Sequence, residues 1–321
     1  MTPKAKTRVL AVVGPTATGK TKLSVNLAKQ LDGEIISADS MQVYEGMEIA
    51  SAKPTKEEMG GIVHHMMSFV PLNSSYNVSM YVKDAKHTLI QSIKNNKLPI
   101  VVGGTGLYVD SLLDNISFAD EGDNSQIREG LEKREKEQGI EALYDELCEI
   151  DLESAKNIHI HNKKRVIRAL EIYYLTGKTM TEQKRLSKMI SSPYDVIYIG
   201  LKCRDRNKLY DRINARVDLM MRNGLLEEAK KTLSEPLGET AKMAIGHKEL
   251  KPYIEGKISL EEALETLKRE TRRYAKRQLT WFLRNERINW IDIDTLSDDD
   301  ILQQSIEIFK KGGSGVDMEN P

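Results

Sequence analysis

Residues 14–21 read Gly14-Pro15-Thr16-Ala17-Thr18-Gly19-Lys20-Thr21 and match the phosphate-binding pattern G-x-x-x-x-G-K-[ST] at every defined position. An apolar run over Arg8–Val13 precedes this motif and a helical pattern over Leu23–Leu31 follows it, which is the strand–loop–helix context that makes the pattern specific. Successive backbone N–H groups and the positive end of the helix surround an anion in such a loop. Lys20 adds a positive charge, and Thr21 offers a hydroxyl to Mg²⁺, the cofactor that we expect. All eight residues are therefore candidates for binding a diphosphate or a triphosphate such as that of ATP.

Strand and helix patterns alternate along much of the chain. Apolar runs typical of buried parallel strands lie at Glu34–Ser37, Leu98–Val102 and Tyr194–Leu201, and a helical pattern covers Met80–Asn95. This alternation predicts an α/β fold, a P-loop NTPase-like parallel sheet core with helices on both faces. We assign residues 1–116 and 194–311 to this catalytic core.

The middle and the end of the chain have different patterns. Residues 117–193 open with an acidic stretch and are then heavily charged and largely helical, so we interpret them as a helical insertion domain. Further helical patterns and one short strand follow, at Arg204–Asn223, Leu225–Ser234, Ser259–Asn285 and Ile288–Ile293. Residues 312–321, which begin Gly-Gly-Ser-Gly, are expected to form a flexible tail.

Composition places the chain among ordinary globular proteins. Lys and Arg together number 48, as do Asp and Glu, so a net charge of zero neither favours nor excludes a nucleic-acid partner. Cys148 and Cys203 lie far apart, which indicates reduced thiols in a cytoplasmic protein. Two pairs of histidines, His64-His65 and His159 with His161, lack the spacing and the neighbouring carboxylates of a zinc site. We therefore interpret them as structural or surface histidines. The first apolar run is too short for a signal peptide or a membrane span, and we expect a monomer without membrane contact.

Two features at strand ends bear on catalysis. Many P-loop NTPases place an Asp at the end of a second strand to hold Mg²⁺, but here that strand ends in Gly103-Gly104. Asp39 instead follows the strand at Glu34–Ser37, and the carboxyl ends of parallel strands open onto the ligand crevice. We favour a catalytic role for Asp39, with the capping of a turn as the alternative. Thr105 is the only side-chain donor of the glycine-rich turn 103–106, which either approaches the substrate or only packs.

Basic residues gather in two further segments. They recur at spacings of three and four over Lys268–Arg287, interleaved with aromatic residues, and they cluster over His161–Arg168. Both patterns favour a polyanion, with a solvated charged face as the alternative for the first. Arg212 and Arg216 share a helix face, where one of them either clamps a diphosphate or forms a surface ion pair with a nearby aspartate.

Taken together, these residues closely resemble the bacterial tRNA dimethylallyltransferase family, a family of prenyltransferases. The resemblance rests on an ordered set of motifs at Gly14–Thr21, Asp39–Tyr44, Gly46–Pro54, His64-His65, Val102–Tyr108, Arg168–Glu171, Ile245-Gly246 and Lys276–Trp281. It implies transfer of the dimethylallyl group from dimethylallyl diphosphate to N6 of adenine 37 in tRNAs that read codons beginning with U. It also implies that the insertion domain clamps the anticodon stem-loop. The sequence departs from the family's common pattern at His159–Lys164 and at His247, where Tyr is common.

The resemblance also implies roles for single residues. Asp39 matches the general base on the adenine amine, Arg216 matches an arginine that contacts the diphosphate, and Thr105 and Arg128 match positions at the reaction channel. The candidate catalytic residues are Asp39, Thr21, Lys20, Thr105 and Arg216, with Thr21 as the Mg²⁺ ligand. The candidate tRNA contacts, taken together with the basic helix, are Asp39, Ser40, Met41, Gln42, Thr105, Arg128, Asn162, Lys163, Lys164, Arg165 and Arg277.

Three alternatives have different products or ligands. A related transferase prenylates free AMP or ADP, but a mononucleotide requires neither the charged insertion nor the basic helix. A small-molecule P-loop kinase would use ATP and form its product without RNA. A non-catalytic RNA-binding protein would bind tRNA regardless of Asp39 or Lys20 and form no prenyl product.

Overall fold

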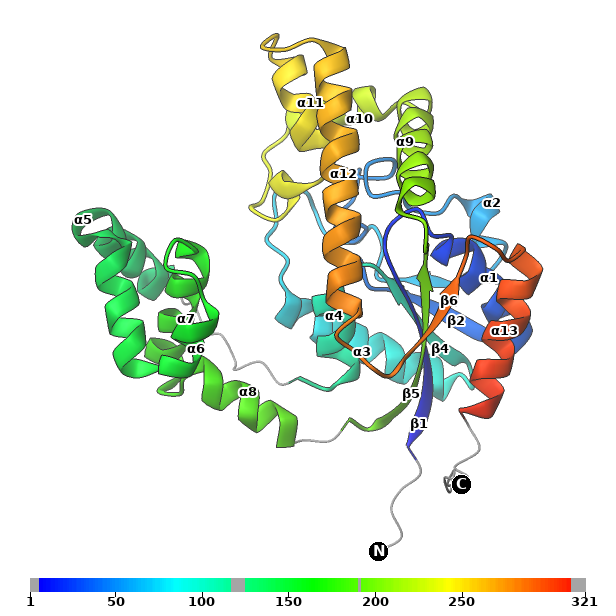
Figure 1. Cartoon of the computed structure of the whole chain (residues 1–321), viewed down its shortest axis with the longest axis horizontal. Helices are drawn as coiled ribbons and strands as arrows, with labels where there is room; N and C mark the ends of the chain where they lie inside the picture. Colours follow the sequence, from blue (N-terminus) through cyan, green and yellow to red (C-terminus); the bar gives the residue numbers. More distant parts are fainter. Residues whose placement is uncertain (1–5, 117–124, 190–191, 313–321) are drawn as a thin grey trace, which may run out of the picture. The chain divides into compact units, whose positions relative to one another are not determined.

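The computed structural model describes residues 6–116, 125–189 and 192–312 of the chain (Figure 1). Contacts between Cα atoms divide the chain into two compact units, one formed by Met1–Leu113 with Pro193–Pro321 and the other by Asp114–Ser192. The second unit takes up the part of the sequence in which we expect a helical insertion domain. Its role in binding tRNA stays a prediction. The expected tail, apart from Gly312, lies outside the described residues.

A parallel sheet forms the centre of the larger unit. Its six described strands are β1 (Thr7–Val13), β2 (Gly33–Ser37), β3 (His64–His65), β4 (Leu98–Gly103), β5 (Tyr194–Lys202) and β6 (Ile288–Asp292). Their spatial order is β3-β2-β4-β1-β5-β6, so β1 lies inside the sheet, with Leu10 beside Ile100 of β4 and Ile197 of β5. Because every strand is parallel, the carboxyl ends meet at one edge, where ligands bind in such sheets.

Helices cover both faces of this sheet (Figure 1). The helices α1 (Lys20–Leu31) and α13 (Asp298–Lys311) lie on one side, and α3 (Val78–Lys94) and α4 (Gly106–Leu113) lie on the other. The short helix α2 (Lys56–Met59) connects β2 to β3. Local sequence sets several helix starts: the Asn77 side chain accepts a hydrogen bond from Met80 N at 3.0 Å to begin α3, and Ser297 begins α13 in a capping box.

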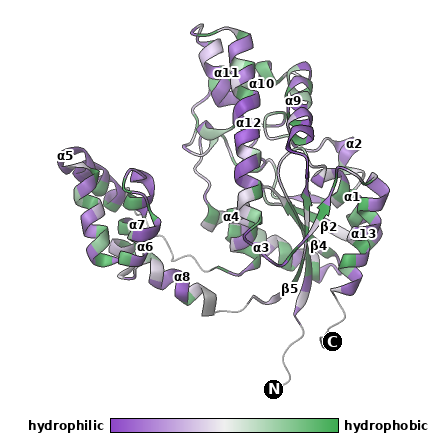
Figure 2. Ribbon diagram, viewed as in Figure 1, coloured by the Kyte–Doolittle hydropathy of each residue, from purple (hydrophilic) through white to green (hydrophobic). Residues whose placement is uncertain are grey.

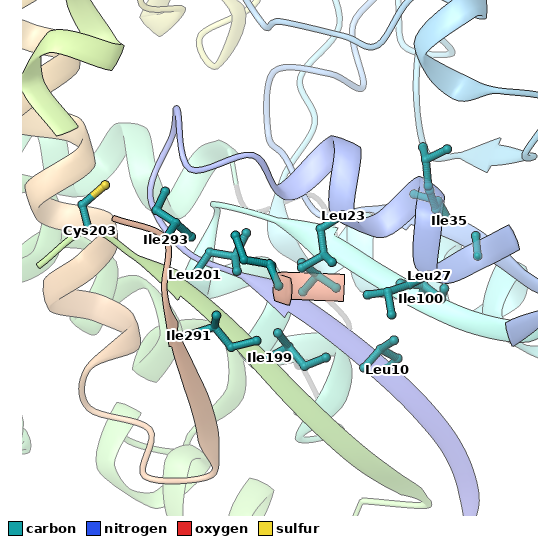
Figure 3. Packing of buried hydrophobic residues seen from close by; sticks show 14 of the residues in the cluster. Leu10, Leu23, Leu27, Ile35, Ile100, Ile199, Leu201, Cys203, Ile291 and Ile293 are labelled. Carbon is teal, nitrogen blue, oxygen red and sulfur yellow. The ribbon is translucent and has the colours of Figure 1, made fainter. Parts of the chain in front are cut away.

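The main hydrophobic core lies between the sheet and the helices α1 and α13. Figure 3 shows Leu10 and Ile199 from neighbouring strands beside Leu23 and Leu27 of α1. Leu23 and Leu27 are four residues apart, so they point to the same side of their helix. Burial of one such side chain contributes about 1.5–3 kcal/mol. This packing fixes α1, and with it the loop 14–19, against the end of β1.

Four further helices form a second cluster in the larger unit. They are α9 (Arg206–Arg222), α10 (Leu225–Leu233), α11 (His247–Ile254) and α12 (Leu260–Phe282), with a 3₁₀ turn at Ala241–Met243. Their shared core consists of Val217, Leu225, Ala229, Leu250, Ala263 and Leu267. Figure 2 shows α12 as largely hydrophilic, yet Ala275, Gln278 and Phe282 on one of its faces are buried. The helix therefore presents a charged face to solvent and a packed face to the rest of the unit.

The smaller unit consists of helices in its described residues. These are α5 (Ser125–Ile150), α6 (Leu152–Asn157), α7 (Lys163–Thr176) and α8 (Met180–Met189). Leu143, Val166 and Leu170 are fully buried in its own hydrophobic core. Asp151 begins α6 and also accepts hydrogen bonds from the backbone N and the Oγ1 of Thr181 at 3.0 and 2.6 Å. Each unit thus has its own apolar core.

The predicted α/β fold class is confirmed. The strands expected at Arg8–Val13, Glu34–Ser37, Leu98–Val102, Tyr194–Leu201 and Ile288–Ile293 all lie in the parallel sheet. The sequence patterns missed β3, α2, α11 and α13. β3 and α2 have only two and four residues, and Pro252 lies inside α11, which has eight. No described helix has the length and apolar character needed to cross a bilayer.

Candidate active site

The loop between β1 and α1 forms a strained turn at the carboxyl edge of the sheet. Ala17 and Gly19 have φ angles of 65° and 87°, and Gly14 has a φ of 141°. A Cβ on Gly14 would lie 2.4 Å from the carbonyl oxygen of Leu201 on β5, so only glycine fits there. The chain then enters α1 at Lys20, which leaves the first N–H groups of that helix directed at the loop. This is the cradle that residues 14–21 predict.

Lys20 lies inside this cradle. Its Nζ donates a hydrogen bond to the carbonyl oxygen of Pro15 at 2.6 Å. Removal from water, and then the positive charge of Arg216, lower the pKa of Lys20 to about 7, while the carboxylate of Asp39 acts in the opposite direction. The ammonium group is therefore poorly stabilised as long as no anion lies beside it. A bound diphosphate would supply that negative charge.

Arg216 comes to the same place from α9. Its Nη1 donates a hydrogen bond to Thr16 Oγ1 at 3.1 Å, and burial lowers its pKa. Arg212, one turn earlier, donates from Nε to the carbonyl oxygen of Ala17 at 2.8 Å but remains exposed. Both arginines thus contact the phosphate-binding loop. Asp218 pairs with Lys268 at 2.8 Å instead.

Asp39 lies at the end of β2 and faces these cations. Its Oδ1 accepts hydrogen bonds from the backbone N of Met41 at 2.8 Å and of Gln42 at 3.4 Å, so the turn-capping interpretation describes one of its oxygens. Oδ2 receives no hydrogen bond from any described residue, and Asp39 lines the cavity. Burial raises the pKa of this carboxyl group, and Lys20 and Arg216 only partly oppose the shift. Asp39 therefore combines an available oxygen with increased basicity.

The second glycine-rich turn packs against the segment that follows β2. Thr105 N donates to the carbonyl oxygen of Ala38 at 3.2 Å, and Ser40 N donates to Thr105 Oγ1 at 3.2 Å. Thr105 thus holds the chain on both sides of Asp39. The turn packs against this segment, while its Gly103 and Gly104 also line the cavity, so both alternatives remain and a contact of Thr105 with a substrate stays a prediction.

A single cavity of about 790 Å³ connects these groups within the larger unit. It is large enough for a small-molecule ligand. Lys20, Asp39 and Arg216 line it together with apolar residues of α9, including Ile213 and Val217. Ser40, Met41 and Gln42 also line it, but the Gln42 amide is engaged within the protein: its Oε1 accepts from Ser37 Oγ at 2.7 Å. One part of the cavity suits a diphosphate and another suits an apolar group.

The buried face of α12 contributes side chains that were not among the candidate site residues, although Gln278 and Trp281 belong to the motif at Lys276–Trp281. Tyr274 and Gln278 line the cavity, and Trp281 Nε1 donates to Asp110 Oδ2 at 2.7 Å. The interpretation of this helix as a basic stripe concerned its other face, on which Arg277 is exposed with its guanidinium 5.7 Å from the centre of the Tyr274 ring. Tyr274, Gln278 and Trp281 are spaced by four and three residues, which places them on one face of a helix. This spacing was the sequence signal that could have identified the buried face of α12.

The remaining candidate RNA contacts lie in the smaller unit, where they are described on their own. Arg128 on α5 donates from Nε to Glu132 Oε1 at 3.2 Å, and Lys163 pairs with Glu135. Asn162 immediately precedes α7, and Lys164 and Arg165 are exposed on its first turn. Their roles in binding RNA stay predictions, as do all the assigned roles of single residues.

The fold and the cavity define a class of protein. A phosphate-binding loop follows a central strand of a parallel sheet, and two cations and one carboxylate lie beside it around one cavity. This arrangement is that of a P-loop protein that acts on a phosphate-bearing ligand.

Comparisons with known proteins narrow this class to one family. The family model for IPP transferase matches residues 42–286. A tRNA dimethylallyltransferase from Bacillus cytotoxicus is 48% identical over 296 residues, which cover 91% of this chain and 92% of the relative, and one from Halalkalibacterium halodurans is 47% identical over 289 residues, or 90% and 92%. The chain therefore belongs to the IPP transferase family, whose members are prenyl-transferring enzymes.

Solved structures agree with this assignment. The full-length tRNA isopentenylpyrophosphate transferase from Bacillus halodurans matches with a TM-score of 0.71 and 42% identity, covering 96% of this chain and 98% of that one. A eukaryotic dimethylallyltransferase acting on tRNA matches with a TM-score of 0.82 and 29% identity, covering 98% and 81%. The expected family resemblance is confirmed over nearly the whole chain.

Proposed function

We propose that this enzyme transfers the dimethylallyl group of dimethylallyl diphosphate to N6 of adenine 37 in tRNAs that read codons beginning with U. One observation carries the proposal: a phosphate cradle with two partly buried cations faces the carboxylate of Asp39 across the same cavity. The strand β4 ends in Gly103 rather than in the aspartate that holds Mg²⁺ in many hydrolytic P-loop enzymes. The site thus combines binding of a leaving diphosphate with a base.

The cradle stabilises the leaving group. As the bond between C1 of the allyl group and the diphosphate oxygen breaks, its electron pair moves onto pyrophosphate. The amides at the start of α1, Lys20 and Arg216 are positioned around that charge before the reaction begins. Donors fixed in this way stabilise the transition state more than the substrate, because they need no reorganisation.

Asp39 accepts the proton. The adenine amine is a weak nucleophile because its lone pair is delocalised into the ring. As the new bond from N6 to C1 forms, one N6 proton passes to Asp39 Oδ2, which receives no hydrogen bond from a described residue. The raised pKa of Asp39 increases its strength as a base. The products are N6-(dimethylallyl)adenosine in the tRNA and pyrophosphate.

Mg²⁺ fits the donors of this site. The described residues include no group of three or more His, Cys, Asp and Glu side chains that could hold a metal ion. Mg²⁺ beside phosphates instead takes one or two protein oxygens, water and phosphate oxygens, and the Thr21 hydroxyl in the cavity is such an oxygen. When bound, the ion supplies further neutralisation of the departing pyrophosphate.

The acceptor is proposed to be a tRNA rather than a free nucleotide. Arg128 and residues Asn162–Arg165 in the smaller unit, with Arg277 on α12, are exposed groups suited to phosphate contacts. The target base must leave the stacked anticodon loop to reach a cavity in the protein. Both described cysteines are free thiols, in keeping with the proposed cytoplasmic location.

The proposed function is tested by offering two acceptors in parallel, with a reaction that lacks an acceptor as the control. The protein is incubated with Mg²⁺, dimethylallyl diphosphate and either unmodified tRNA, free AMP or no acceptor, and the nucleosides are weighed after digestion. We expect one added dimethylallyl group on tRNA adenosine only. The same gain on AMP alone would move the protein to the mononucleotide-prenylating class. No product on either, with ATP consumption in the presence of a small acceptor, would identify a kinase.

A further inference from the structure

Gln278 on α12 bridges the two glycine-rich turns of the site. Its Oε1 accepts a hydrogen bond from the backbone N of Thr16 at 2.9 Å, and its Nε2 donates to the carbonyl oxygen of Gly104 at 3.1 Å. The side chain is only 5% exposed. One amide therefore satisfies a backbone donor of the phosphate-binding loop and a backbone acceptor of the second turn.

The surrounding backbone is shaped to receive this side chain. A Cβ on Gly104 would lie 2.0 Å from Gln278 Nε2, and a Cβ on Gly106 would lie 2.1 Å from the Trp281 ring. The turn thus approaches α12 so closely that a side chain at either position would displace Gln278 or Trp281. The hydrogen bond from Trp281 to Asp110 fixes the same helix to α4 just beyond the turn.

The bridge continues to the proposed base. Thr105, next to Gly104, accepts from Ser40 N and donates its own N–H to Ala38, so the turn holds both neighbours of Asp39. On the other side, Thr16 accepts from Arg216 through its hydroxyl while its N–H is bound to Gln278. Gln278 thus links the diphosphate cradle to the turn that holds the segment carrying Asp39.

A primary amide fills both requirements, because it carries one oxygen acceptor and one nitrogen donor. A carboxylate accepts but does not donate, an ammonium donates but does not accept, and an apolar side chain of the same length does neither. Each of these three replacements leaves at least one buried backbone group without a partner, and the result is a displaced backbone or an added water. The residue type is therefore explained by the two contacts together.

We propose that Gln278 is a positioning residue that clamps the phosphate-binding loop to the second glycine-rich turn and so sets the separation between the diphosphate and Asp39. The inference rests on the proposed function and extends it to a residue that contacts neither reacting atom. It separates two effects. The bond to Thr16 shapes the cradle and therefore diphosphate affinity, whereas the bond to Gly104 aligns the Asp39 segment and therefore turnover.

Two substitutions separate these contacts. Gln278→Met removes both hydrogen bonds but keeps a side chain of similar length. Gln278→Glu keeps an oxygen acceptor for Thr16 N but has no N–H to donate to the carbonyl oxygen of Gly104. The control is Thr280→Ala, which changes an exposed residue of the same helix. The measurements are kcat and KM for dimethylallyl diphosphate, the affinity for inorganic pyrophosphate with Mg²⁺ by calorimetry, and the Kd for tRNA.

We expect Gln278→Met to lower kcat/KM and pyrophosphate affinity by at least tenfold each, with a tRNA Kd within threefold of wild type. Gln278→Glu should lose at least tenfold in kcat and, because it adds a negative charge beside the cradle, should also bind pyrophosphate more weakly. A purely structural role would instead lower the folded fraction and leave both constants of the folded enzyme unchanged. Pyrophosphate affinity and kcat/KM in both variants within twofold of Thr280→Ala would overturn the clamp.

The pyrophosphate measurement keeps the two proposals distinguishable. If the wild-type protein forms no prenylated tRNA, the proposed function fails, while pyrophosphate binding by wild type and Gln278→Met still decides whether the clamp shapes the cradle. If Gln278→Met does not fold, the kcat of folded Gln278→Glu relative to Thr280→Ala decides whether the contact with Gly104 matters for turnover.

Discussion

Arg216 and Thr16 are hydrogen-bonded at 3.1 Å, guanidinium to hydroxyl, although 200 residues of sequence separate them. The contact joins α9 to the phosphate-binding loop and places a second cation beside Lys20. Burial lowers the pKa of both groups, and the charge of Arg216 lowers the pKa of Lys20 further. Such an arrangement is unfavourable without an anion and becomes favourable when a diphosphate binds. The affinity of the site for a diphosphate follows from these two incompletely neutralised positive charges.

Replacing Arg216 should weaken transition-state stabilisation. We expect Arg216→Ala to lower kcat/KM for dimethylallyl diphosphate by about 10²–10³, because one preorganised donor to the developing charge is lost. Arg216→Lys should recover only part of this loss, because an ammonium does not reproduce the planar guanidinium. Steady-state kinetics at saturating tRNA gives both values. Arg222→Ala, at the exposed end of the same helix, is the matched control, and an Arg216→Ala enzyme as active as that control would remove Arg216 from this role.

Binding of the diphosphate should take up a proton at Lys20. The pKa of Lys20 is about 7, and a bound anion raises it, so above pH 7 binding must protonate part of the lysine population. Affinity for pyrophosphate should therefore fall as pH rises from 7 to 9, by up to about tenfold per unit from this group. Lys20→Arg carries a charge that does not titrate in this range and should show a shallower dependence. Calorimetry in two buffers of different ionisation enthalpy measures the uptake; equal uptake by wild type and Lys20→Arg would contradict the prediction.

Removing the proposed base should slow turnover without releasing the RNA. Asp39→Asn keeps an oxygen for the N–H groups of Met41 and Gln42 but cannot accept the N6 proton, so we expect kcat to fall by about 10²–10⁴. Because burial raises the pKa of Asp39, the acid limb of the wild-type rate profile should lie above the ordinary value of about 3.9. The variant should lose that limb. A near wild-type rate in single-turnover experiments would exclude Asp39 as the base.

Glu228 on α10 should control the loop that forms one wall of the cavity. Its carboxylate accepts hydrogen bonds from the backbone N of Glu48, Ile49 and Ala50 at 2.8, 2.7 and 2.9 Å, and it lies 3.0 Å from His247 Nε2. These contacts lower the pKa of Glu228, so it is charged at neutral pH. We expect Glu228→Ala to destabilise the protein by about 3 kcal/mol, because several buried donors lose their acceptor.

Urea unfolding followed by fluorescence measures this effect. Glu227→Ala removes the exposed neighbouring carboxylate and should change stability by no more than about 0.5 kcal/mol. A similar stability for the two variants would show that the loop does not depend on Glu228.

Sequence patterns predicted those parts of the molecule that depend on neighbours along the chain. The motif at 14–21 determines its own turn, because Gly14, Ala17 and Gly19 carry the unusual backbone angles within six residues. Asp39 was predictable because a strand end locates it. Gln278 lies in the motif at Lys276–Trp281, but its contacts could not be predicted, since its partner Thr16 lies 262 residues away and charged residues dominate the pattern of α12. The spacing of Arg212 and Arg216 predicts that they lie on the same face of their helix. It does not indicate which part of the chain that face contacts.

The most direct test of the proposed function is to determine the position and identity of the modified nucleoside. Two tRNAs that differ only at position 37, one with adenine and one with guanine, are incubated with the protein, Mg²⁺ and dimethylallyl diphosphate, and the anticodon-loop fragments are weighed. Transfer to N6 of adenine 37 predicts one dimethylallyl group on the fragment with adenine 37 and none on the fragment with guanine. Equal labelling of both fragments, or labelling outside the anticodon loop, would contradict transfer to N6 of adenine 37.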